Sequence, residues 1–333
     1  MDAIELVFGT ATRGMEIPHV RPNFETNVPG IFIAGELGGM GLIRNAVEQG
    51  RQAVDSIHQK NGSAEDGHLD LLIVGAGPAG FAASLAAKQR NMKVVTIEQD
   101  TLGGTVASYP RGKLVMTKPA HLPLVGQMKF TETTKEELLA YWGQVEQNTG
   151  IEINYRERLE QVSPDKGGFH IKTTRDSYRV RSVLLAIGRR GTPRKLGVAG
   201  EELDKVTYRL IDPDQYAGKH LLVVGGGDSA LEAATSVAER SDTTVTLSYR
   251  SEAFTRVRQK NRKRLEELST AGKINLLMNS NVTQINKHAV HIEQAGQSIE
   301  LINQAVIICA GGILPSAFLG NLGVEVNTKH GTS

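Results

Sequence analysis

Short apolar runs alternate with longer stretches of helical periodicity along most of the 333 residues. The run at 71–74 leads into a glycine-rich turn, a helix rich in small residues and a second apolar run, "KVVTIE", at 93–98. A similar unit begins at about residue 194 and ends near residue 310. Strands that alternate with helices predict parallel sheets built from βαβ units, so we expect an α/β fold.

Residues 1–58 form a separate opening segment. An apolar strand-like run, "GIFIAG", precedes a helical stretch predicted from about Leu42 to Ile57. Residues 59–68, "QKNGSAEDGH", are polar and contain glycine, which predicts a flexible linker. The boundaries that follow are 1–58, the linker 59–68, a first domain at 69–193, a second at 194–310 and a tail at 311–333.

Composition narrows the class of protein. Hydrophobic residues make up 40% and charged residues 22%, as in soluble globular proteins. A formal charge of +2 favours neither nucleic acid nor a membrane as the main partner. The chain contains one cysteine, Cys309, which excludes a disulfide or a CxxC pair within this chain. A cytoplasmic location is the expectation, with membrane association of a full-length protein left open.

The first glycine loop has the order of a dinucleotide-binding unit. Gly75 permits the tight turn, Gly77 lets the backbone approach a diphosphate, and Gly80 lets the helix pack on the strand. The helix then begins with Pro78 and Ala79, and its N-terminus offers free N–H groups to the diphosphate. Glu98 ends the next strand, 23 residues after Gly75, where a carboxylate can accept both ribose hydroxyls of an adenosine. Gln99 follows it.

The second glycine loop lies 150 residues later, in "HLLVVGGGDSALEAA". Here the cofactor-binding candidates are Gly225, Gly227, Asp228, Ser229 and Ala230. The next strand ends without an acid, in Ser248, Tyr249 and Arg250, and Arg256 and Arg258 follow closely. An arginine where NAD sites carry an acid favours a 2′-phosphate and therefore NADPH over NADH. The alternative is that these arginines form a solvated face, because the basic run continues through Lys260, Arg262, Lys263 and Arg264.

These motifs resemble the thioredoxin-reductase-like flavoproteins. The paired loops, "GGGDSALEAA", Gly103-Gly104 and "AIG" at 186–188 carry the resemblance, which extends to thioredoxin-reductase-type ferredoxin–NADP reductases and to bacillithiol disulfide reductases. The resemblance implies two Rossmann-like, three-layer ββα domains, with FAD in the first and NAD(P)H in the second. Relatives are homodimers, so it also implies a dimer.

The opening segment resembles the closing segment of such a flavoprotein. In the family, a strand reading roughly "T-x-x-P-G-I-F-A-A-G-D" is followed by a helix that points at the flavin, and here Thr26 to Glu36 has that pattern. The tail "FLGNLGVEVNTKHG" leads into this piece in relatives. We therefore expect a circularly permuted FAD domain, completed by residues 1–58. A ten-residue linker reaches about 33 Å, which suffices. The alternative is that residues 1–58 derive from an upstream domain and leave the flavin site open.

Further candidates come from the resemblance. It implies that Gly35 and Glu36 meet the ribityl and diphosphate region, and that the helix near Leu42 directs its positive end at the flavin. It also implies that the flavin lies along Gly103, Gly104 and Thr105, and that Ala186 and Gly188 line the site. Lys118, His121 and His19 are possible flavin neighbours, or plain loop residues.

The first residues, "MDAIELVF", look like the strand after the last cluster cysteine of bacterial ferredoxins. This implies an upstream [4Fe–4S] ferredoxin domain; an ordinary edge strand is the alternative. The family's redox cysteines are missing, since "TYRLIDPDQYAG" lacks the CxxC of thioredoxin reductases. Ala79 likewise replaces the loop cysteine of bacillithiol disulfide reductases. Cys309 is expected to be a buried, inert thiol.

Three functions follow from these features. The first is an FAD-dependent NAD(P)H oxidoreductase that exchanges electrons with a ferredoxin-like partner or fused domain. The second is an NADPH-dependent reductase of a small disulfide or quinone that acts directly at the flavin. The third is a flavin-bound redox sensor with little turnover.

Overall fold

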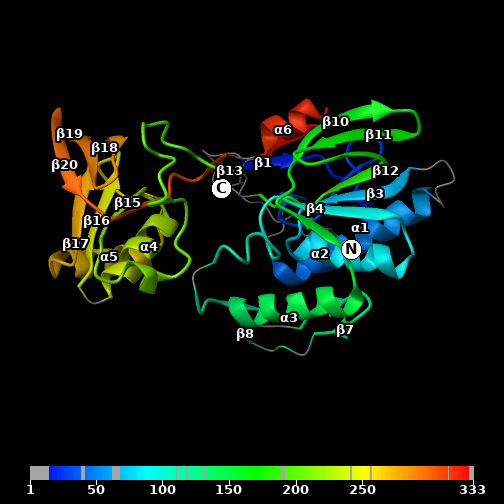
Figure 1. Cartoon of the computed structure of the whole chain (residues 1–333), viewed down its shortest axis with the longest axis horizontal. Coiled ribbons are helices and arrows are strands. Elements are labelled where there is room, and N and C mark those ends of the chain that lie inside the picture. The colour runs from blue at the N-terminus through cyan, green and yellow to red at the C-terminus, as the bar shows by residue number, and fades with distance from the viewer. Residues whose placement is uncertain are drawn as a thin grey trace. The chain divides into compact units, whose positions relative to one another are not determined.

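The computed structural model describes residues 15–38, 42–61, 68–109, 111–116, 119–128, 130, 132–189, 192–240, 242–255, 257–313 and 315–329. The chain divides into two compact units (Figure 1). Unit 1 comprises residues 1–107, 112–191 and 314–333, and unit 2 comprises residues 108–111 and 192–313. The α/β class predicted from the alternating pattern is confirmed, with a parallel sheet and a glycine loop in each unit.

The sheet of unit 1 has the strand order β10-β11-β12-β3-β4-β9, and β2 pairs with β12 beside this path. Its central strands β2, β12, β3, β4 and β9 run parallel, while β10 and β11 join antiparallel. The strand bounds are β2 (Ile31–Ile33), β3 (Leu69–Val74), β4 (Val94–Glu98), β9 (Ile153–Tyr155), β10 (Leu159–Asp165), β11 (Gly168–Thr173) and β12 (Ser177–Leu185).

Both faces of this sheet are covered. Phe32, Leu71 and Ile73 point to the face that packs on α1 (Ile43–Asn61) and α2 (Pro78–Gln89). Their neighbours Ile33, Leu72 and Val74 pack on the opposite face, with residues of β11 and of α6 (Ser316–Asn321). Figure 1 shows α6 on the side of the sheet opposite α1 and α2. Successive side chains of a strand point to opposite faces, so a strand covered on both sides reads as a continuous apolar run.

The opening segment lies inside unit 1. Val183↔Ile31 and Leu185↔Ile33 are paired in the parallel β12–β2 ladder. Asp55 of α1 forms ion pairs with Arg51 of the same helix and with Arg90 beyond the end of α2. The helix α1 begins and ends later than predicted, and residues 59–61, which we predicted to be linker, are helical. Residues 62–67 lie outside the described residues.

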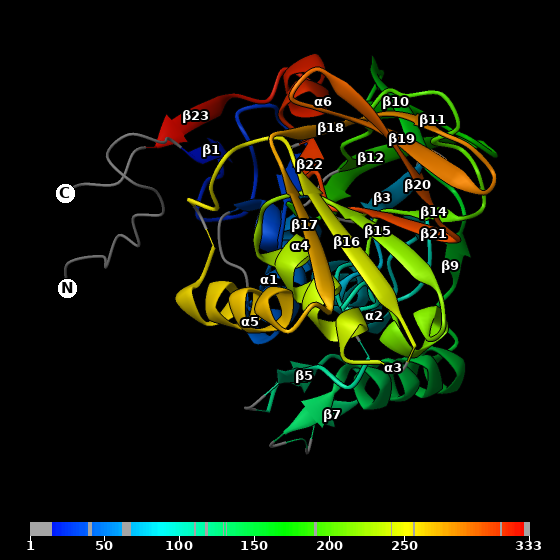
Figure 2. The same ribbon diagram turned by 90° about the vertical axis from the view of Figure 1, so that its left-hand side faces the viewer.

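The two ends of the described chain are paired with each other. Strand β1 (Met15–Pro18) is antiparallel to β23 (Val326–Lys329), with Met15 opposite Lys329. Figure 2 shows the two strands side by side. The side chain of Asn27 extends the contact, because its amide donates to the carbonyl of Gly323 and its oxygen accepts from the N–H of Glu325.

Helix α3 (Lys135–Thr149) also belongs to unit 1. Thr134 and Glu137 form a capping box at its start, and Gly150 ends it in a left-handed conformation with φ of 61°. Before it lie the 3-10 helix η1 (Glu36–Gly38) and short strand pairs, whose bounds are β5 (Leu114–Met116) with β8 (Thr133–Thr134) and β6 (His121–Leu122) with β7 (Gly126–Gln127).

Unit 2 has a five-stranded parallel sheet in the order β14-β21-β15-β16-β17. Helices α4 (Asp228–Ala238) and α5 (Gln259–Thr270) pack on one face, and the antiparallel sheet β18-β19-β20 supplies the apolar cover of the other (Figures 1 and 2). The remaining bounds are β13 (Thr192–Pro193), β14 (Val206–Thr207), η2 (Pro213–Tyr216), β15 (His220–Val224), β16 (Thr244–Tyr249), β17 (Ile274–Met278), β18 (Ser280–Ile285), β19 (Ala289–Gln294), β20 (Gln297–Ile302), β21 (Ala305–Ile308) and β22 (Gly312–Ile313).

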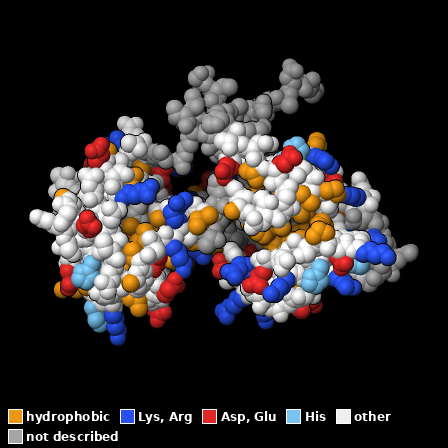
Figure 3. Space-filling model, turned by 90° about the horizontal axis from the view of Figure 1, so that it is seen from above, with side chains coloured by type: hydrophobic (Ala, Val, Ile, Leu, Met, Phe, Trp, Pro, Cys, Tyr) orange, Lys and Arg blue, Asp and Glu red, His pale blue; other side chains and the backbone are white. Residues whose placement is uncertain are grey.

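Side chains of both charge signs are interspersed on the visible face of each unit (Figure 3), as a net charge of +2 suggests. Among the described residues, no helix combines the length and the apolar character that crossing a bilayer requires.

Candidate functional site

The predicted flavin-site residues of unit 1 converge on one edge of its sheet. Gly35, Gly75 and Ala186 follow the carboxyl ends of the parallel strands β2, β3 and β12, and Glu98 is the last residue of β4. The turn after β3 is tied to its neighbours, since the N–H of Gly75 donates to Ile97 O at 2.8 Å and that of Ala186 to Val74 O at 2.9 Å. Ligands of α/β sheets bind at this edge.

The three glycines of the first loop differ in how much space surrounds them. Gly75 has φ of 103°, and a Cβ there would lie 2.6 Å from Ala186 O. A Cβ on Gly80 would lie 1.7 Å from Gly75 O, so only glycine lets α2 approach the strand. Gly77 is different, because a Cβ there would come no closer than 3.9 Å to any atom outside its chain neighbours. Its open side is the position where a ligand can reach the backbone.

Helix α2 begins directly at this loop. Gly77 is its N-cap and has no side chain to cap the helix, and Pro78 occupies the first turn. The N-terminal N–H groups of a helix that lacks a side-chain cap need another acceptor, and a diphosphate is a suitable one.

The turn at 103–105 closes one side of the loop. The N–H of Gly103 donates to Ala76 O at 2.9 Å, and a Cβ on Gly104 would lie 3.2 Å from the Cα of Gly77. Gly188 stands opposite, where a Cβ would be 3.8 Å from Thr105 Oγ1. The sequence-predicted residues of the two turns are therefore neighbours of the glycine loop.

Glu98 is buried, with 6% of its surface exposed, and Gln99 beside it is exposed. One carboxylate oxygen of Glu98 accepts from the N–H of Ala76 at 2.7 Å, and the other accepts from the N–H of Asp100 at 2.9 Å. Burial raises the pKa of Glu98, and these two N–H donors partly offset that shift. Each oxygen keeps a lone pair for a further donor, such as a ribose hydroxyl.

The opening segment reaches the same loop. A Cβ on Gly35, which has φ of 86°, would lie 3.0 Å from the Cβ of Ala79, and the N–H of Gly35 donates to Gln49 Oε1 at 2.8 Å. Gly50 in α1 lies against the first turn of α2, where a Cβ would be 2.0 Å from Ala79 O. Residues on each side of the linker therefore meet at the start of α2.

Glu36 and Leu42, the other two predicted residues of the opening segment, lie on either side of residues 39–41, which are outside the described residues. Glu36 begins η1, and Leu42 precedes α1 with 62% of its surface exposed. The carbonyl of Leu42 accepts from the N–H of Ala46 at 2.9 Å, which makes Leu42 the residue that leads into the helix.

These residues fit the dinucleotide FAD on structural grounds. An open glycine, a helix start without a side-chain cap and a buried carboxylate follow one another along the strand ends. The same order was predicted from the sequence, although the contacts from Gln49 and Gly50 were missed. A glycine and an amide in an amphipathic helix give no signal of their own, because a partner distant in sequence creates the requirement.

Unit 2 has a similar glycine loop, and its second glycine, Gly227, has more open space around it than Gly77 has in unit 1. Gly225 has φ of 144°, and a Cβ there would lie 2.4 Å from Cys309 O. At Gly227 a Cβ would meet nothing within 4 Å, and α4 begins after this residue without a side-chain cap. Ala230 is buried in the first turn of α4, and Ser229 beside it is exposed.

Tyr249 is the last residue of β16, and Arg250 directly follows it. The side chain of Arg250 is exposed, and within the described part of the chain it forms no hydrogen bond or ion pair. Asp228 is only partly available to a ligand, because it accepts from the N–H of Arg258 at 2.9 Å and from the amide of Asn261 at 2.7 Å. Arg256 lies outside the described residues.

Cys309 directly follows β21 in unit 2, and its side chain is partly buried, not fully buried as predicted. Burial raises the pKa of its thiol to about 12, so the thiolate is a negligible fraction at neutral pH. Its backbone N–H donates to Val224 O at 2.7 Å, which fixes this strand end beside Gly225. The chemistry of this cysteine is therefore that of a packed side chain.

Of the three residues predicted as possible flavin neighbours, the structure describes His19 and His121, which have different surroundings. His19 has an exposed side chain, and its N–H donates to Glu325 O beside the β1–β23 pair. His121 lines a cavity of about 260 Å³ together with Arg44, Asn45 and Glu48 of α1. Lys118 lies outside the described residues, as does the ferredoxin-like stretch 2–8.

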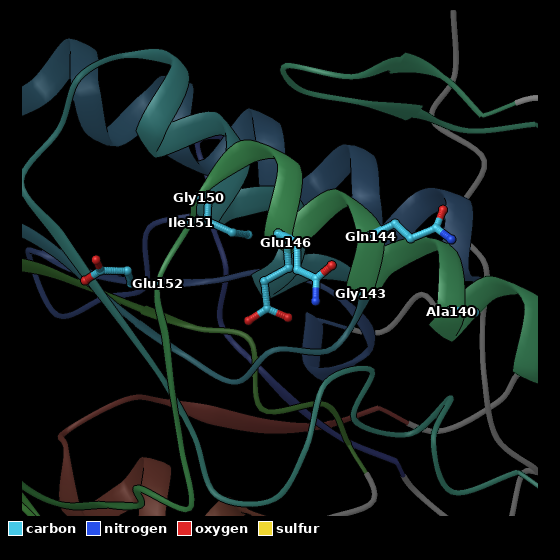
Figure 4. A pocket seen from close by; sticks show the side chains of 8 residues that line it. Ala140, Gly143, Gln144, Glu146, Gly150, Ile151 and Glu152 are labelled. Carbon is cyan, nitrogen blue, oxygen red and sulfur yellow. The ribbon is translucent and has the colours of Figure 1, made fainter.

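A second pocket, of about 690 Å³, contains none of the predicted site residues. It lies along α3 and the turn that follows, where Figure 4 shows Gln144 and Glu146 among its side chains. Glu146 is already occupied there, because both its oxygens accept from the hydroxyl of Tyr155 at 2.9 Å. The size of this pocket is therefore no reason to move the candidate site away from the strand ends.

Comparison with known proteins agrees with this geometry. Residues 72–332 match the family model described as pyridine nucleotide-disulphide oxidoreductase. The ferredoxin–NADP reductase of Ignicoccus hospitalis is 32% identical over 56% of the chain and 57% of the relative. The corresponding enzyme of Pediococcus pentosaceus is 30% identical over 60% of the chain and 58% of the relative. The chain thus spans less than two thirds of these curated relatives.

Solved structures give the same picture. The bacillithiol disulfide reductase of Staphylococcus aureus is 25% identical, with a TM-score of 0.61 over 77% of the chain and 80% of that protein. The thioredoxin reductase of T. acidophilum is also 25% identical, with a TM-score of 0.56 over 78% of the chain and 82% of that protein. With two glycine-loop units and a family match over most of its length, this chain belongs to the pyridine nucleotide-disulphide oxidoreductases.

Proposed function

We propose that the chain is an FAD-dependent NADPH oxidoreductase that exchanges electrons with an iron–sulfur partner. The observation that carries this proposal is the pair of unlike glycine loops. One is followed by a strand that ends in the buried carboxylate Glu98, and the other by a strand that is directly followed by the exposed Arg250. A carboxylate suits an adenosine ribose, and an arginine suits a 2′-phosphate. The similarity to ferredoxin–NADP reductases supports the choice of partner.

The flavin domain is completed, in this proposal, by a circular permutation. Three observations support it. The family match begins only at residue 72, yet β2 lies in the same sheet as β3 and β12. Gly35 and Gly50 lie against Ala79 at the start of α2. Strands β1 and β23, at opposite ends of the sequence, are paired as the two arms of a hairpin would be.

Each element of the site has a defined part in binding. FAD, when bound, accepts hydride from a reduced nicotinamide and passes electrons singly to a one-electron acceptor. The first turn of α2 binds the diphosphate through its N–H groups, and Glu98 accepts the hydroxyls of the ribose. The N-terminus of α1, which follows Leu42, contributes the positive end of a helix dipole near the ring. The chain's own residues thus supply position and electrostatics.

The electrons leave without a thiol relay in this proposal. Cys309 has no second cysteine in the chain, and its pKa of about 12 keeps it protonated. Ala79 lies at the loop position where bacillithiol disulfide reductases carry a cysteine by resemblance. An acceptor that takes single electrons needs no such thiol. The stretch 2–8, which resembles a ferredoxin strand, is a further reason to favour a [4Fe–4S] partner or fused domain.

A second function is favoured by one observation. The similarity to a bacillithiol disulfide reductase suggests a small disulfide that is reduced directly at the flavin. The cavity lined by Arg44 and His121 beside the first turn of α1 offers polar groups for such a substrate. Ferredoxin and a low-molecular-weight disulfide are therefore the two acceptors to compare.

The test is a flavin spectrum followed by rapid mixing. The purified chain, reconstituted with FAD, is mixed with NADPH or NADH, and bleaching is followed near about 450 nm. We expect fast bleaching with NADPH, slower bleaching with NADH, and reoxidation by a [4Fe–4S] ferredoxin. Arg250→Ala should reduce the NADPH advantage about tenfold or more. Lys263→Ala is the matched control, because it removes one basic side chain from the same unit, where Lys263 pairs with Glu267 at 4.0 Å.

Three results would contradict the proposal in different ways. A chain that binds no flavin fails it entirely. Equal rates with NADPH and NADH refute the 2′-phosphate assignment only. Reoxidation by a disulfide and not by ferredoxin would select the second function.

A further inference from the structure

The segment that follows β16 is held in place by an aromatic pair. The rings of Tyr249 and Phe254 are stacked, with centroids 5.3 Å apart and planes at 7°. Phe254 is buried at 9% exposure, whereas Arg250 between the two rings in sequence is exposed. The stack therefore closes a short loop on itself and leaves the arginine on the outside.

The backbone of the second glycine loop packs against this aromatic pair. A Cβ on Gly226 would lie 2.2 Å from ring atoms of Tyr249, so the ring rests directly on the loop backbone. Any residue larger than glycine at this position would push the ring away. The position of the Arg250 loop is thereby tied to the loop that opens α4.

Helix α5 holds the same segment from its other end. The guanidinium of Arg262 donates to the carbonyl of Phe254. Asp228 at the start of α4 accepts from the N–H of Arg258 and from the amide of Asn261, at 2.9 and 2.7 Å. The carboxylate of Asp228 therefore joins the first turn of α4 to the residues that begin α5.

We propose that Phe254 and Asp228 are positioning residues that set the preference of this unit for a 2′-phosphorylated adenosine. The inference rests on the proposed use of NADPH, and it assigns the preference to the supports of Arg250 as well as to Arg250 itself. An arginine on a loose loop must lose chain and side-chain freedom when it binds a phosphate. A loop that is fixed beforehand avoids much of that loss, and the gain appears only with the ligand that carries the extra phosphate.

The test measures direct binding and needs no flavin turnover. Binding of 2′,5′-ADP and of 5′-AMP to the full chain is measured by calorimetry for the wild type, Phe254→Leu, Phe254→Tyr and Asp228→Asn. Phe254→Leu keeps apolar packing and removes the ring, while Phe254→Tyr restores a ring. Arg250→Ala serves as the reference for loss of phosphate contact. Asp214→Asn is the matched acid-to-amide control, because Asp214 pairs with Arg240 at 2.5 Å in the same unit.

We expect the wild type to bind 2′,5′-ADP at least tenfold more tightly than 5′-AMP. Phe254→Leu and Asp228→Asn should each weaken 2′,5′-ADP about three- to tenfold, in line with the measured value of one aromatic pair or charged hydrogen bond. Their binding of 5′-AMP should change less than twofold. Phe254→Tyr and Asp214→Asn should match the wild type.

Each contrary outcome has its own meaning. If Phe254→Leu and Asp228→Asn weaken both ligands equally, these residues only stabilise the fold, and the inference is wrong. If they change neither ligand while Arg250→Ala does, the arginine needs no support, and the inference is again wrong. If the wild type itself binds the two ligands equally, the NADPH assignment is wrong, and the inference that rests on it is wrong as well. Near-UV circular dichroism identifies a variant that has not folded, and the other substitution then decides.

Discussion

Gly50 provides the sharpest test of how the opening segment is attached. A Cβ added there would lie 2.0 Å from Ala79 O, whereas ordinary contacts begin at 3.4 Å. Gly50→Ala therefore forces α1 and the first turn of α2 apart by about 1.4 Å, the difference between these two distances. The obstacle is a backbone oxygen in a helix, which cannot rotate away as a side chain can.

The size of the effect follows from two opposed contributions. Overpacking of this kind costs about 1–3 kcal/mol, and a backbone obstacle belongs at the upper end of that range. Alanine regains about 1 kcal/mol of helix propensity. The net loss is about 2 kcal/mol, which lowers the melting temperature of a unit of this size by about 4–8 °C.

Gly143 in α3 is the matched control. A Cβ there meets nothing within 4 Å, so Gly143→Ala gains helix propensity without a clash. We expect a rise of about 2–4 °C in the melting temperature. Both variants should be melted by circular dichroism after removal of FAD and again with excess FAD, because bound ligand adds its own stabilisation. A Gly50→Ala variant as stable as Gly143→Ala would show that α1 does not pack on α2.

Three more predictions concern other parts of the chain. Burial raises the pKa of Cys309 to about 12, so alkylation of the native protein at pH 8 should be about a thousandfold slower than alkylation of the unfolded chain. The free energy of unfolding that this thiol contributes should fall as the pH rises above about 9. Rapid labelling of the native protein would contradict this prediction. Asp55→Asn should cost about 1 kcal/mol in the free energy of unfolding, less at high salt, while Glu202→Gln in an exposed pair should cost almost nothing. The last prediction concerns a circular permutant in which a two-residue turn joins Lys329 to Met15 and the new termini lie after α1. This variant should fold and bind FAD, as judged by circular dichroism and flavin absorbance. Aggregation of the variant would argue against the permutation.

The glycine loops and the strands around them could be predicted because their requirements are local. The positive φ of Gly75 belongs to the turn itself, and Gly80 must lack a Cβ because it lies against the carbonyl of Gly75, five residues earlier. The order of strand, turn, helix and strand is enough to predict such positions. The parallel sheets follow from the same alternation, since a helix between two strands brings the second strand back alongside the first.

Other features depend on partners that the sequence does not place. The helix of the opening segment was predicted to end at Ile57, but α1 continues to Asn61, and Lys60 in its last turn forms an ion pair with the buried Glu25. Asp228 was predicted as a cofactor ligand, and its Oδ1 also accepts hydrogen bonds from Arg258 and Asn261 at the start of α5. The passage of residues 108–111 into unit 2 was not predicted, because no local pattern marks it.

The pairing of β2 with β12 and of β1 with β23 has a consequence for synthesis of the protein. The first strands leave the ribosome about 150 residues before β12, which at 5–20 residues per second is a wait of roughly 8–30 s. During that time the buried side chains of β2, Ile31, Phe32 and Ile33, lack the strand that they pair with in the folded protein. Nascent chains of this protein should therefore depend on chaperones more than a chain whose paired strands are close in sequence, and slowing translation should lower its soluble yield.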